Sequence, residues 1–308
     1  MSHHGKGHFH GKRGGGDHRR EGRGRSKPAI GDKAKEILEN IDEDSPVIKS
    51  FRKYAAELDL KHDKHERIVK LSRDITIESK RIIFLLHSAD KESKKAAALN
   101  EAETRLSNLH DNGFKKIAFE LEGEDTYQFL PAYWAGLQEF VEATTFFYYL
   151  KSNMLHHWKD IQKSLTYSVE VSKETAEDSE GAEKEDEPVE CREIKTLLPP
   201  VDYVMGVADL TGELMRKCIM SLGTGDIETC HKTCSFVREI YRGFLRNGQV
   251  SPWLDKKTNV LRTSLSKMEA ACYELAVRGT EIPAHLLAET VSRRAQGDDF
   301  NDEDEGFY

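Results

Sequence analysis

Apolar residues recur every three or four positions along most of this chain, which is the period of an α-helix with one buried side. The longest such pattern begins after Ser45 and Pro46, residue types that favour the N-cap and the first position of a helix, and continues to about His87. A helix of that length measures about 60 Å, which is longer than a compact domain is wide. We therefore predict one very long first helix, or two end to end, that supports a helical bundle and an oligomer interface.

Shorter helical patterns follow along the rest of the chain. They predict helices over residues 91–121, 136–165, 201–222, 226–246 and 253–278, with short ones near Tyr127 and from Pro283. No useful stretch alternates apolar and polar residues, and no Asn-Gly turn separates two apolar runs, so no strand is expected. The prediction is an all-α fold with about seven helices in a single helical-bundle domain.

Three stretches fall outside this pattern because they contain too few apolar residues to build a core. They are a basic arm rich in Gly, His and Arg over residues 1–44, an acidic loop over 170–190 and an acidic tail over 293–308. The arm and the loop are expected to be disordered, and residues 45–292 are expected to form the helical domain. For the arm, nuclear import or nonspecific RNA contact and a solubilising role are equally compatible with the composition.

The net charge of −8 conceals a division along the chain. Residues 1–30 hold eight basic and two acidic residues, 170–190 hold ten acidic and two basic ones, and 297–308 hold six acidic ones. The rest of the chain is neutral and has no overall field that would attract nucleic acid. Nucleic-acid contact is therefore expected only from a local patch or from the basic arm.

The composition also limits the compartment. No apolar run approaches the roughly 20 residues that cross a bilayer, and residues 1–30 contain no apolar segment typical of a signal peptide. We expect a soluble protein of the cytoplasm and nucleus that does not contact membranes.

Five cysteines, an odd number without paired C-x-x-C spacing, indicate reduced thiols. Cys230 and Cys234 lie one helical turn apart, but with no second Cys/His pair at ligand spacing they are interpreted as small apolar residues.

The polar side of the predicted first helix mixes basic and acidic residues. Its basic candidates for contact with RNA phosphates are Lys70, Arg73, Lys80 and Arg81. Acidic residues alternate with them at helical spacing, which is typical of a solvated face with i,i+4 ion pairs. We favour the solvated face and keep the four basic residues as candidate RNA contacts.

Two pairs of acids at helical spacing are the candidate chemical site. Glu139 and Glu142 fall on the aromatic side of a predicted helix that is apolar around much of its circumference, so they do not resemble ordinary surface acids. Asp209 and Glu213 lie on the polar side of the helix predicted from residue 201. Considered alone, that helix is an ordinary amphipathic helix with surface ion pairs.

If the fold joins the two pairs, four carboxylates form a site for a hard metal ion. Mg²⁺ prefers oxygen ligands, lowers the pKa of a bound water and neutralises phosphate charge, which is the chemistry of metal-assisted phosphodiester cleavage. Glu139, Glu142, Asp209 and Glu213 are accordingly the candidate metal ligands and catalytic residues. No P-loop, serine-nucleophile, zinc-protease or dinucleotide-binding motif offers a rival site.

Four longer segments are distinctive. They are HDKHERIVKLSRDITIESKR over residues 62–81, GLQEFVEA over 136–143, GVADLTGELMR over 206–216 and VRGTEIP over 277–283. In this order they resemble the translin family. The similarity runs from about residue 45 to 288 and excludes the basic arm, the acidic loop and the acidic tail.

The resemblance implies an all-α fold of the translin type and assembly with translin into a closed hetero-octamer that encloses RNA. It also implies an Mg²⁺-dependent endoribonuclease for single-stranded RNA, with single-stranded DNA as a further candidate ligand, that removes passenger strands in RNA silencing and trims transfer-RNA fragments. The acidic positions of the family's catalytic subunit fall on Glu139, Glu142, Asp209 and Glu213, and all four are acidic here. The alternative is a noncatalytic subunit that stabilises translin and binds nucleic acid.

Overall fold

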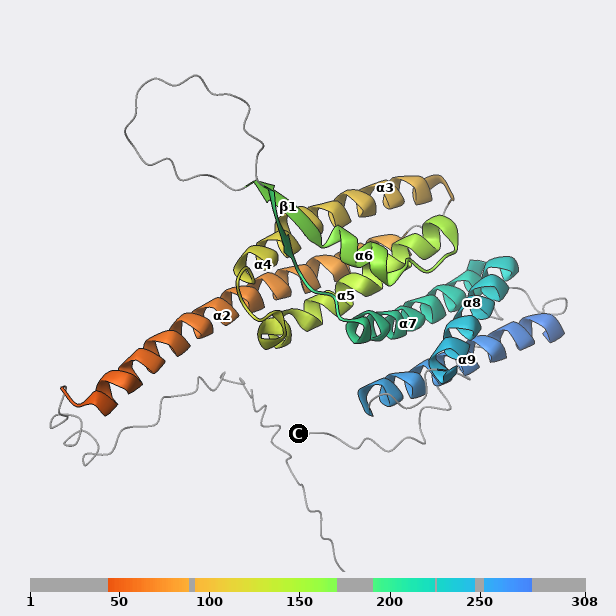
Figure 1. Ribbon diagram of the computed structural model, residues 1–308. Coiled ribbons are helices and arrows are strands. Elements are labelled where there is room, and N and C mark those ends of the chain that lie inside the picture. Colours follow the sequence, from red (N-terminus) through yellow and green to blue (C-terminus); the bar gives the residue numbers. More distant parts are fainter. Residues whose placement is uncertain (1–43, 89–91, 171–190, 225, 247–251, 279–308) are drawn as a thin grey trace, which may run out of the picture. The chain divides into compact units, whose positions relative to one another are not determined.

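The computed structural model describes residues 44–88, 92–170, 191–224, 226–246 and 252–278 (Figure 1). The chain divides into two compact units, residues 1–58 and residues 59–308. The predicted basic arm before residue 44, residues 171–190 of the predicted acidic loop, the acidic tail and the short helix from Pro283 all lie outside the described residues. Glu170, the first residue of the predicted loop, instead ends a β-strand that covers Thr166–Glu170. The predicted domain boundaries at 44 and 292 therefore stay predictions.

The described part of the first unit is the beginning of helix α2 (Pro46–His87). The helix starts as predicted, since the backbone N–H of Lys49 donates to the Ser45 carbonyl at 3.1 Å. Val47, Phe51, Tyr54 and Leu58 form an apolar stripe here, and each is at least 57% exposed. The described residues of this chain leave that stripe uncovered.

The second unit contains the rest of α2 and the remaining helices. These are α3 (Glu92–Asn108), η1 (Leu109–Phe114), α4 (Lys115–Glu120), α5 (Thr126–Ser152), α6 (Trp158–Ser164), α7 (Pro200–Thr224), α8 (Ile227–Arg246) and α9 (Pro252–Arg278). The π-helical turn η1 joins α3 to α4 without a break, so these three segments form one continuous helix. Over the described residues the prediction of an all-α fold with about seven helices and a very long first helix is confirmed.

Local sequence explains where two of these helices begin and end. α5 begins ten residues before the predicted position, because the side chain of Asp125 accepts a hydrogen bond from the Tyr127 N–H and caps the helix. It ends at Ser152 rather than near residue 165, because Asn153 adopts a left-handed conformation with φ of 54°. Asp226 caps α8 as expected, accepting from the Thr229 N–H at 3.0 Å.

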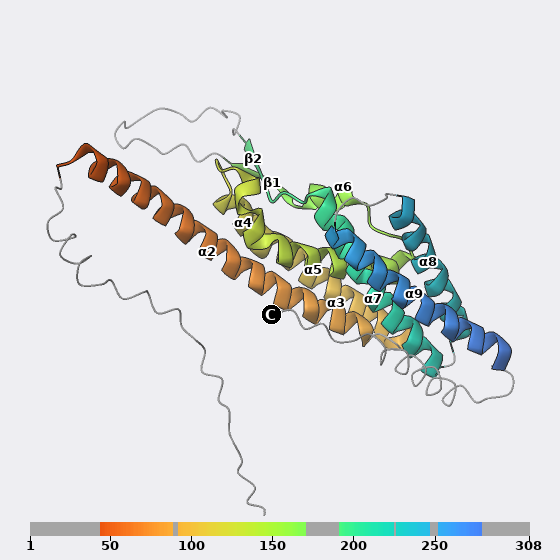
Figure 2. The same ribbon diagram turned by 90° about the horizontal axis from the view of Figure 1, so that it is seen from below.

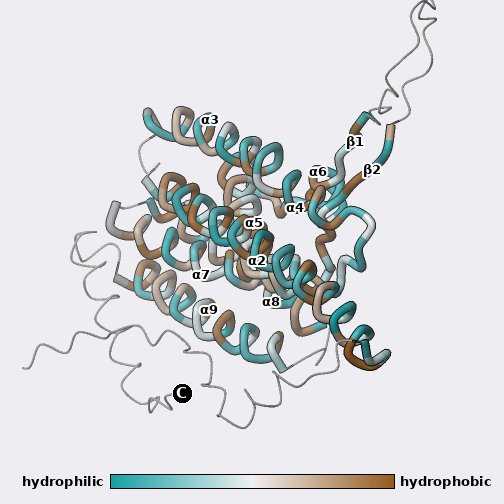
Figure 3. Tube along the Cα trace, turned by 90° about the vertical axis from the view of Figure 1, so that its left-hand side faces the viewer, coloured by the Kyte–Doolittle hydropathy of each residue, from teal (hydrophilic) through white to brown (hydrophobic). Residues whose placement is uncertain are grey.

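Helix α5 is the centre of the core. Leu137, Phe140, Val141 and Phe146 are fully buried on it, as expected for a helix that is apolar on nearly all sides. On one side it packs against α7, which in turn packs against α8 and α9, and the ribbon views show these helices side by side (Figures 1 and 2). The hydropathy colouring of α2 and α9 instead alternates between hydrophilic and hydrophobic, as expected for helices with one buried side (Figure 3).

The structure adds a feature that the apolar pattern did not predict, a two-stranded antiparallel sheet. Strand β1 (Thr166–Glu170) pairs with β2 (Cys191–Lys195), with Tyr167 opposite Ile194. Ile194 is buried, and the Tyr167 hydroxyl donates to the His110 carbonyl at 2.9 Å, which ties the hairpin to η1. Five-residue strands with few buried positions are too short for a clear period-two signal.

None of the described helices has the length and apolarity needed to cross a membrane.

Candidate carboxylate site

The four predicted acids share one electrostatic neighbourhood, and Glu142 on α5 is its most buried member. Only 9% of Glu142 is exposed. Burial, which is the largest cause, and the charges of Asp209, Glu139 and Glu213, in that order, together raise the pKa of this carboxyl group to about 8. The structure therefore brings acids from α5 and α7 close enough to repel one another.

A close approach of two helices explains how the pairs meet. Gly206 on α7 lies against α5, where a Cβ atom would come within 2.8 Å of the Gln138 carbonyl oxygen and of the Val141 side chain. Asp209 follows three residues later and Glu213 one further turn on, so both stand on the part of α7 that runs past Glu142. The glycine brings the backbones together where the acids lie.

Basic groups contact three of the four acids. Nε2 of His87 lies 2.5 Å from Oε2 of Glu213, and Nζ of Lys80 lies 3.1 Å from Oε1 of Glu139. Nζ of Lys257 on α9 contacts Oδ2 of Asp209 and also lowers the pKa of Glu142. The two lysine contacts offset part of the negative charge of the acids on α5 and α7.

His87 is the most buried of these three basic partners. It is 6% exposed, ends α2 and packs its ring against Phe146 at a centroid distance of 4.8 Å. Its hydrogen bond is the largest cause that lowers the pKa of Glu213, and its charge and that of Arg216 add to the effect. The hydrogen bond from His87 therefore favours the ionised form of Glu213 by lowering its pKa, whereas burial favours the neutral form of Glu142 by raising its pKa.

Sequence reasoning missed both His87 and Lys257. His87 lies 126 positions from Glu213, and Lys257 lies 48 positions from Asp209, so no local spacing links them. A basic residue at the end of an apolar stripe was the only signal for His87, and it is equally typical of an ordinary helix C-terminus. Lys257 carries no distinguishing signal of its own.

The donor set suits a hard cation, although the acids do not form a closed cage. Carboxylate oxygens are ligands that Mg²⁺ prefers, and a divalent ion would offset the repulsion that raises the pKa of Glu142. No three of the four acids bring carboxylate oxygens within 4.8 Å of one another; among the described residues only three cysteines form so tight a group. The site fits an ion that keeps waters and takes phosphate ligands, rather than one enclosed by protein.

The predicted RNA-contact residues of α2 fall into two groups. Lys80 contacts Glu139, and Arg81 contacts Glu78 at 3.3 Å, so both take part in ion pairs of the kind expected for a solvated face. Lys70 and Arg73 are exposed on the same helix. The structure leaves their RNA contact a prediction.

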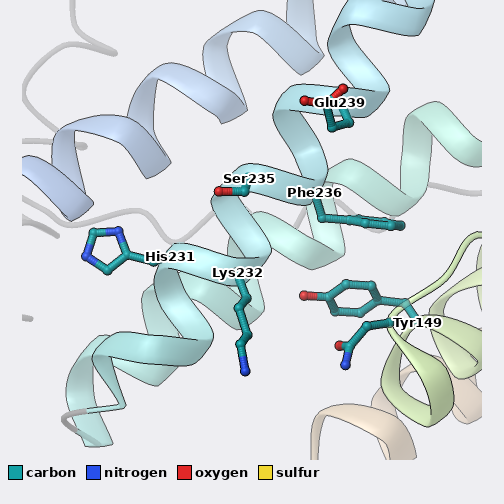
Figure 4. A pocket seen from close by; sticks show the side chains of 7 residues that line it. Tyr149, His231, Lys232, Ser235, Phe236 and Glu239 are labelled. Atoms are coloured by element: carbon teal, nitrogen blue, oxygen red, sulfur yellow. The ribbon is translucent and has the colours of Figure 1, made fainter.

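A pocket of about 550 Å³ lies apart from the predicted residues, between the end of α5 and α8 (Figure 4). Tyr149 and Phe236 form its aromatic wall, with ring centroids 4.7 Å apart. His231, Lys232 and Glu239 line its polar side from α8. None of the four acids lines it, so the carboxylate site is the better candidate for the predicted chemistry.

The fold and the site define an all-α helical bundle that gathers four acids, one of them protonated near neutral pH, where α5 meets α7. Residues 63–279 match the Translin family, and this chain belongs to that family.

Its relatives specify the branch of the family. Translin-associated protein X of Mus musculus is 46% identical over 254 residues, covering 80% of this chain and 84% of that protein. The translin-associated protein X homolog of Schizosaccharomyces pombe is 30% identical over 236 residues, covering 74% and 87%. Translin of Gallus gallus is similar over only 78 residues, at 31% identity, covering 25% of this chain and 34% of that protein.

A solved structure agrees with the fold. The crystal structure of apo-NeC3PO superposes with a TM-score of 0.50 and 19% identity, covering 73% of this chain and 95% of that chain. At this identity the likeness concerns the fold alone.

Proposed function

We propose that this chain is the catalytic subunit of an endoribonuclease complex with translin, which cleaves single-stranded RNA by Mg²⁺-dependent hydrolysis. The observation that supports this most is the convergence of Glu139 and Glu142 with Asp209 and Glu213, seen in the raised pKa of Glu142. A carboxyl group whose pKa is shifted by burial and by three like charges is typical of a functional site rather than of a surface ion pair. Membership of the translin family adds the class of complex.

In this proposal the four acids would hold the Mg²⁺ ion together with waters and RNA phosphate oxygens, and the ion would supply an activated water and neutralise phosphate charge. His87 orients Glu213 through its hydrogen bond and holds it ionised. Lys257 holds Asp209 from the opposite helix and limits the repulsion on Glu142. Exposed basic residues of α2, Lys70 and Arg73, would position the RNA backbone by charge alone.

The wider roles follow from the same proposal. Such a complex would remove nicked passenger strands in RNA silencing and trim transfer-RNA fragments, in the cytoplasm and the nucleus. Single-stranded DNA would be a further ligand, since backbone phosphates are the common recognised group.

The test is conservative replacement of the acids in a complex with translin. Glu142→Gln and Glu213→Gln keep side-chain size, so they should lower single-stranded RNA cleavage with Mg²⁺ by at least about 100-fold while RNA binding is retained. Glu103→Gln is the matched control, because Glu103 is an exposed acid paired with Lys151 outside the site. Full activity of both site variants would rule out the assignment.

One observation favours a second function, that of a noncatalytic subunit that stabilises translin and binds nucleic acid. Three of the four acids already have basic partners, as structural ion pairs do. Under this alternative, the purified complex binds single-stranded RNA normally and leaves it intact at every Mg²⁺ concentration.

A further inference from the structure

Four of the five cysteines of this chain gather where three helices meet. Cys218 comes from α7, Cys230 and Cys234 come from α8, and Cys272 comes from α9. All four are free thiols and none is more than 9% exposed. The fifth, Cys191, is exposed on β2.

The sulfur atoms are closely spaced. Sγ of Cys230 lies 2.9 Å from Sγ of Cys218 and 3.5 Å from Sγ of Cys272. All three sulfur atoms lie within 4.8 Å of one another. Among the described residues, no other three potential metal-ligand side chains lie so close together. Cys234 stands one helical turn after Cys230 and outside that group of three, and its thiol interacts with that of Cys272.

The 3.5 Å separation is close to that of a thiolate metal centre, and the 2.9 Å separation is shorter. Zn–S bonds of about 2.3 Å in a tetrahedron hold sulfur atoms roughly 3.8 Å apart. Thiolates are soft ligands that select Zn²⁺ or Cu⁺ over the hard cations that carboxylates bind. Facing helices of a bundle commonly build such sites from inward side chains.

We propose that Cys218, Cys230 and Cys272 bind a Zn²⁺ ion, with Cys234 as the fourth ligand. Four protein ligands in a buried position make a closed, structural site, which locks α7, α8 and α9 together. Each thiol that coordinates loses one proton to solvent, so four protons leave as one ion enters and no oxidation is involved. The guanidinium of Arg238 lies 3.8 Å from Sγ of Cys234 and offsets part of the negative charge of the centre.

Under this proposal Cys230 and Cys234 would be metal ligands, whereas the sequence alone favoured small apolar residues at both positions. That interpretation depended on the lack of a second ligand pair at ligand spacing in the sequence. The fold supplies the pair from Cys218 and Cys272, each on a different helix. The proposal rests on these sulfur positions and is independent of the carboxylate site.

Metal content is the direct test. The full-length chain, produced with added zinc and purified without chelators, should contain about one Zn²⁺ per chain by plasma mass spectrometry. Cys191→Ser should keep that content, because Cys191 stands outside the cluster, whereas Cys230→Ser combined with Cys272→Ser should lose most of it. A folded wild-type protein that holds no thiophilic metal, and takes up none on refolding with Zn²⁺, would overturn the proposal.

A second measurement avoids variants that fail to fold. On the wild-type protein, a mercurial thiol reagent should release zinc in step with modification of the buried cysteines, and a colorimetric chelator follows the release. Co²⁺ taken up in place of zinc should show the intense visible absorption of a tetrahedral thiolate centre. An intact mass lower by two hydrogens, which reports a disulfide in the cluster, would instead exclude the metal site.

Discussion

Nε2 of His87, at the end of α2, lies 2.5 Å from Oε2 of Glu213 on α7. The imidazole is buried against Phe146, so its position is fixed by packing as well as by the hydrogen bond. The position of Glu213 on α7 is therefore held by His87 on α2, which lies 126 positions away in the sequence. The arrangement resembles the support that neighbouring groups give to metal ligands.

Loss of His87 should weaken catalysis without abolishing it. In His87→Ala the pKa of Glu213 rises toward its ordinary value, because the hydrogen bond that lowers it is gone. We expect cleavage to fall by about 10- to 100-fold and the acidic limb of the pH–rate profile to move to higher pH. The rate of single-stranded RNA cleavage against pH measures both. His62→Ala, at an exposed position of the same helix, should leave rate and profile unchanged.

Glu142 should make stability depend on pH. Its pKa is about 8 in the folded protein and about 4.3 in an unfolded chain, so between these values the folded protein holds a proton that the unfolded chain releases. The free energy of unfolding therefore falls as pH rises through this window. In Mg²⁺-free buffer we expect a loss of about 2–4 kcal/mol between pH 5 and pH 8, measured by urea unfolding.

Glu142→Gln should remove that loss, because a neutral amide has no proton to release. The variant should match the wild type near pH 5 and exceed it in stability near pH 8. Glu103→Gln should keep the wild-type slope, since Glu103 pairs with Lys151 at the surface. Equal slopes in Glu142→Gln and the wild type would contradict the raised pKa.

Lys257 should compete with a divalent ion. It contacts Asp209 and lowers the pKa of Glu142, so Lys257→Met leaves the acids with less compensation. We expect Mg²⁺ to bind about 10-fold more tightly to this variant, measured by calorimetry. The neighbouring Lys256 is exposed, and Lys256→Met should show wild-type affinity. Weaker Mg²⁺ binding in Lys257→Met would show that the lysine supports the ion instead.

The glycines of α7 offer a test of the close approach of α5 and α7. A Cβ at Gly206 would come within 2.8 Å of α5, whereas a Cβ at Gly212 would meet nothing within 4 Å. Gly206→Ala should therefore lower the free energy of unfolding by about 1–3 kcal/mol and separate the acid pairs. Gly212→Ala should raise it by up to about 1 kcal/mol, since alanine favours a helix. Thermal unfolding of the two variants measures whether the free energy of unfolding falls in Gly206→Ala and rises in Gly212→Ala.

The basic residues of α2 should contribute to RNA affinity through charge alone. Lys70→Gln and Arg73→Gln should each weaken binding similarly for all sequences and reduce the slope of log affinity against log salt by about 1. Fluorescence anisotropy at several salt concentrations measures this slope. Lys49→Gln, which replaces a lysine paired with Asp44, is the control. An unchanged slope in both variants would show that Lys70 and Arg73 do not contact RNA phosphates and belong to a solvated face.

Periodicity predicted most of the fold because each helix is specified by residues close in sequence. The same projection placed Glu139 and Glu142 on the aromatic side of their helix; Glu142 is buried, whereas Glu139 is half-buried. For Asp209 and Glu213, periodicity favoured an exposed face, and only the packing of α7 on α5 gives them a shared environment with Glu142. That packing depends on Gly206, because a side chain at this position would collide with α5. A helical wheel cannot show this, since it contains no information about the distance between two helices.

The strand pair β1 and β2 has a practical consequence for engineering the chain. Its register places Glu170 opposite Cys191, and paired residues of an antiparallel ladder lie about 5 Å apart. Doubling the length of a flexible segment between fixed ends costs only about 0.6 kcal/mol. A reporter domain or an affinity tag inserted between these strands should therefore be tolerated, with the helices that carry the four acids left unaltered.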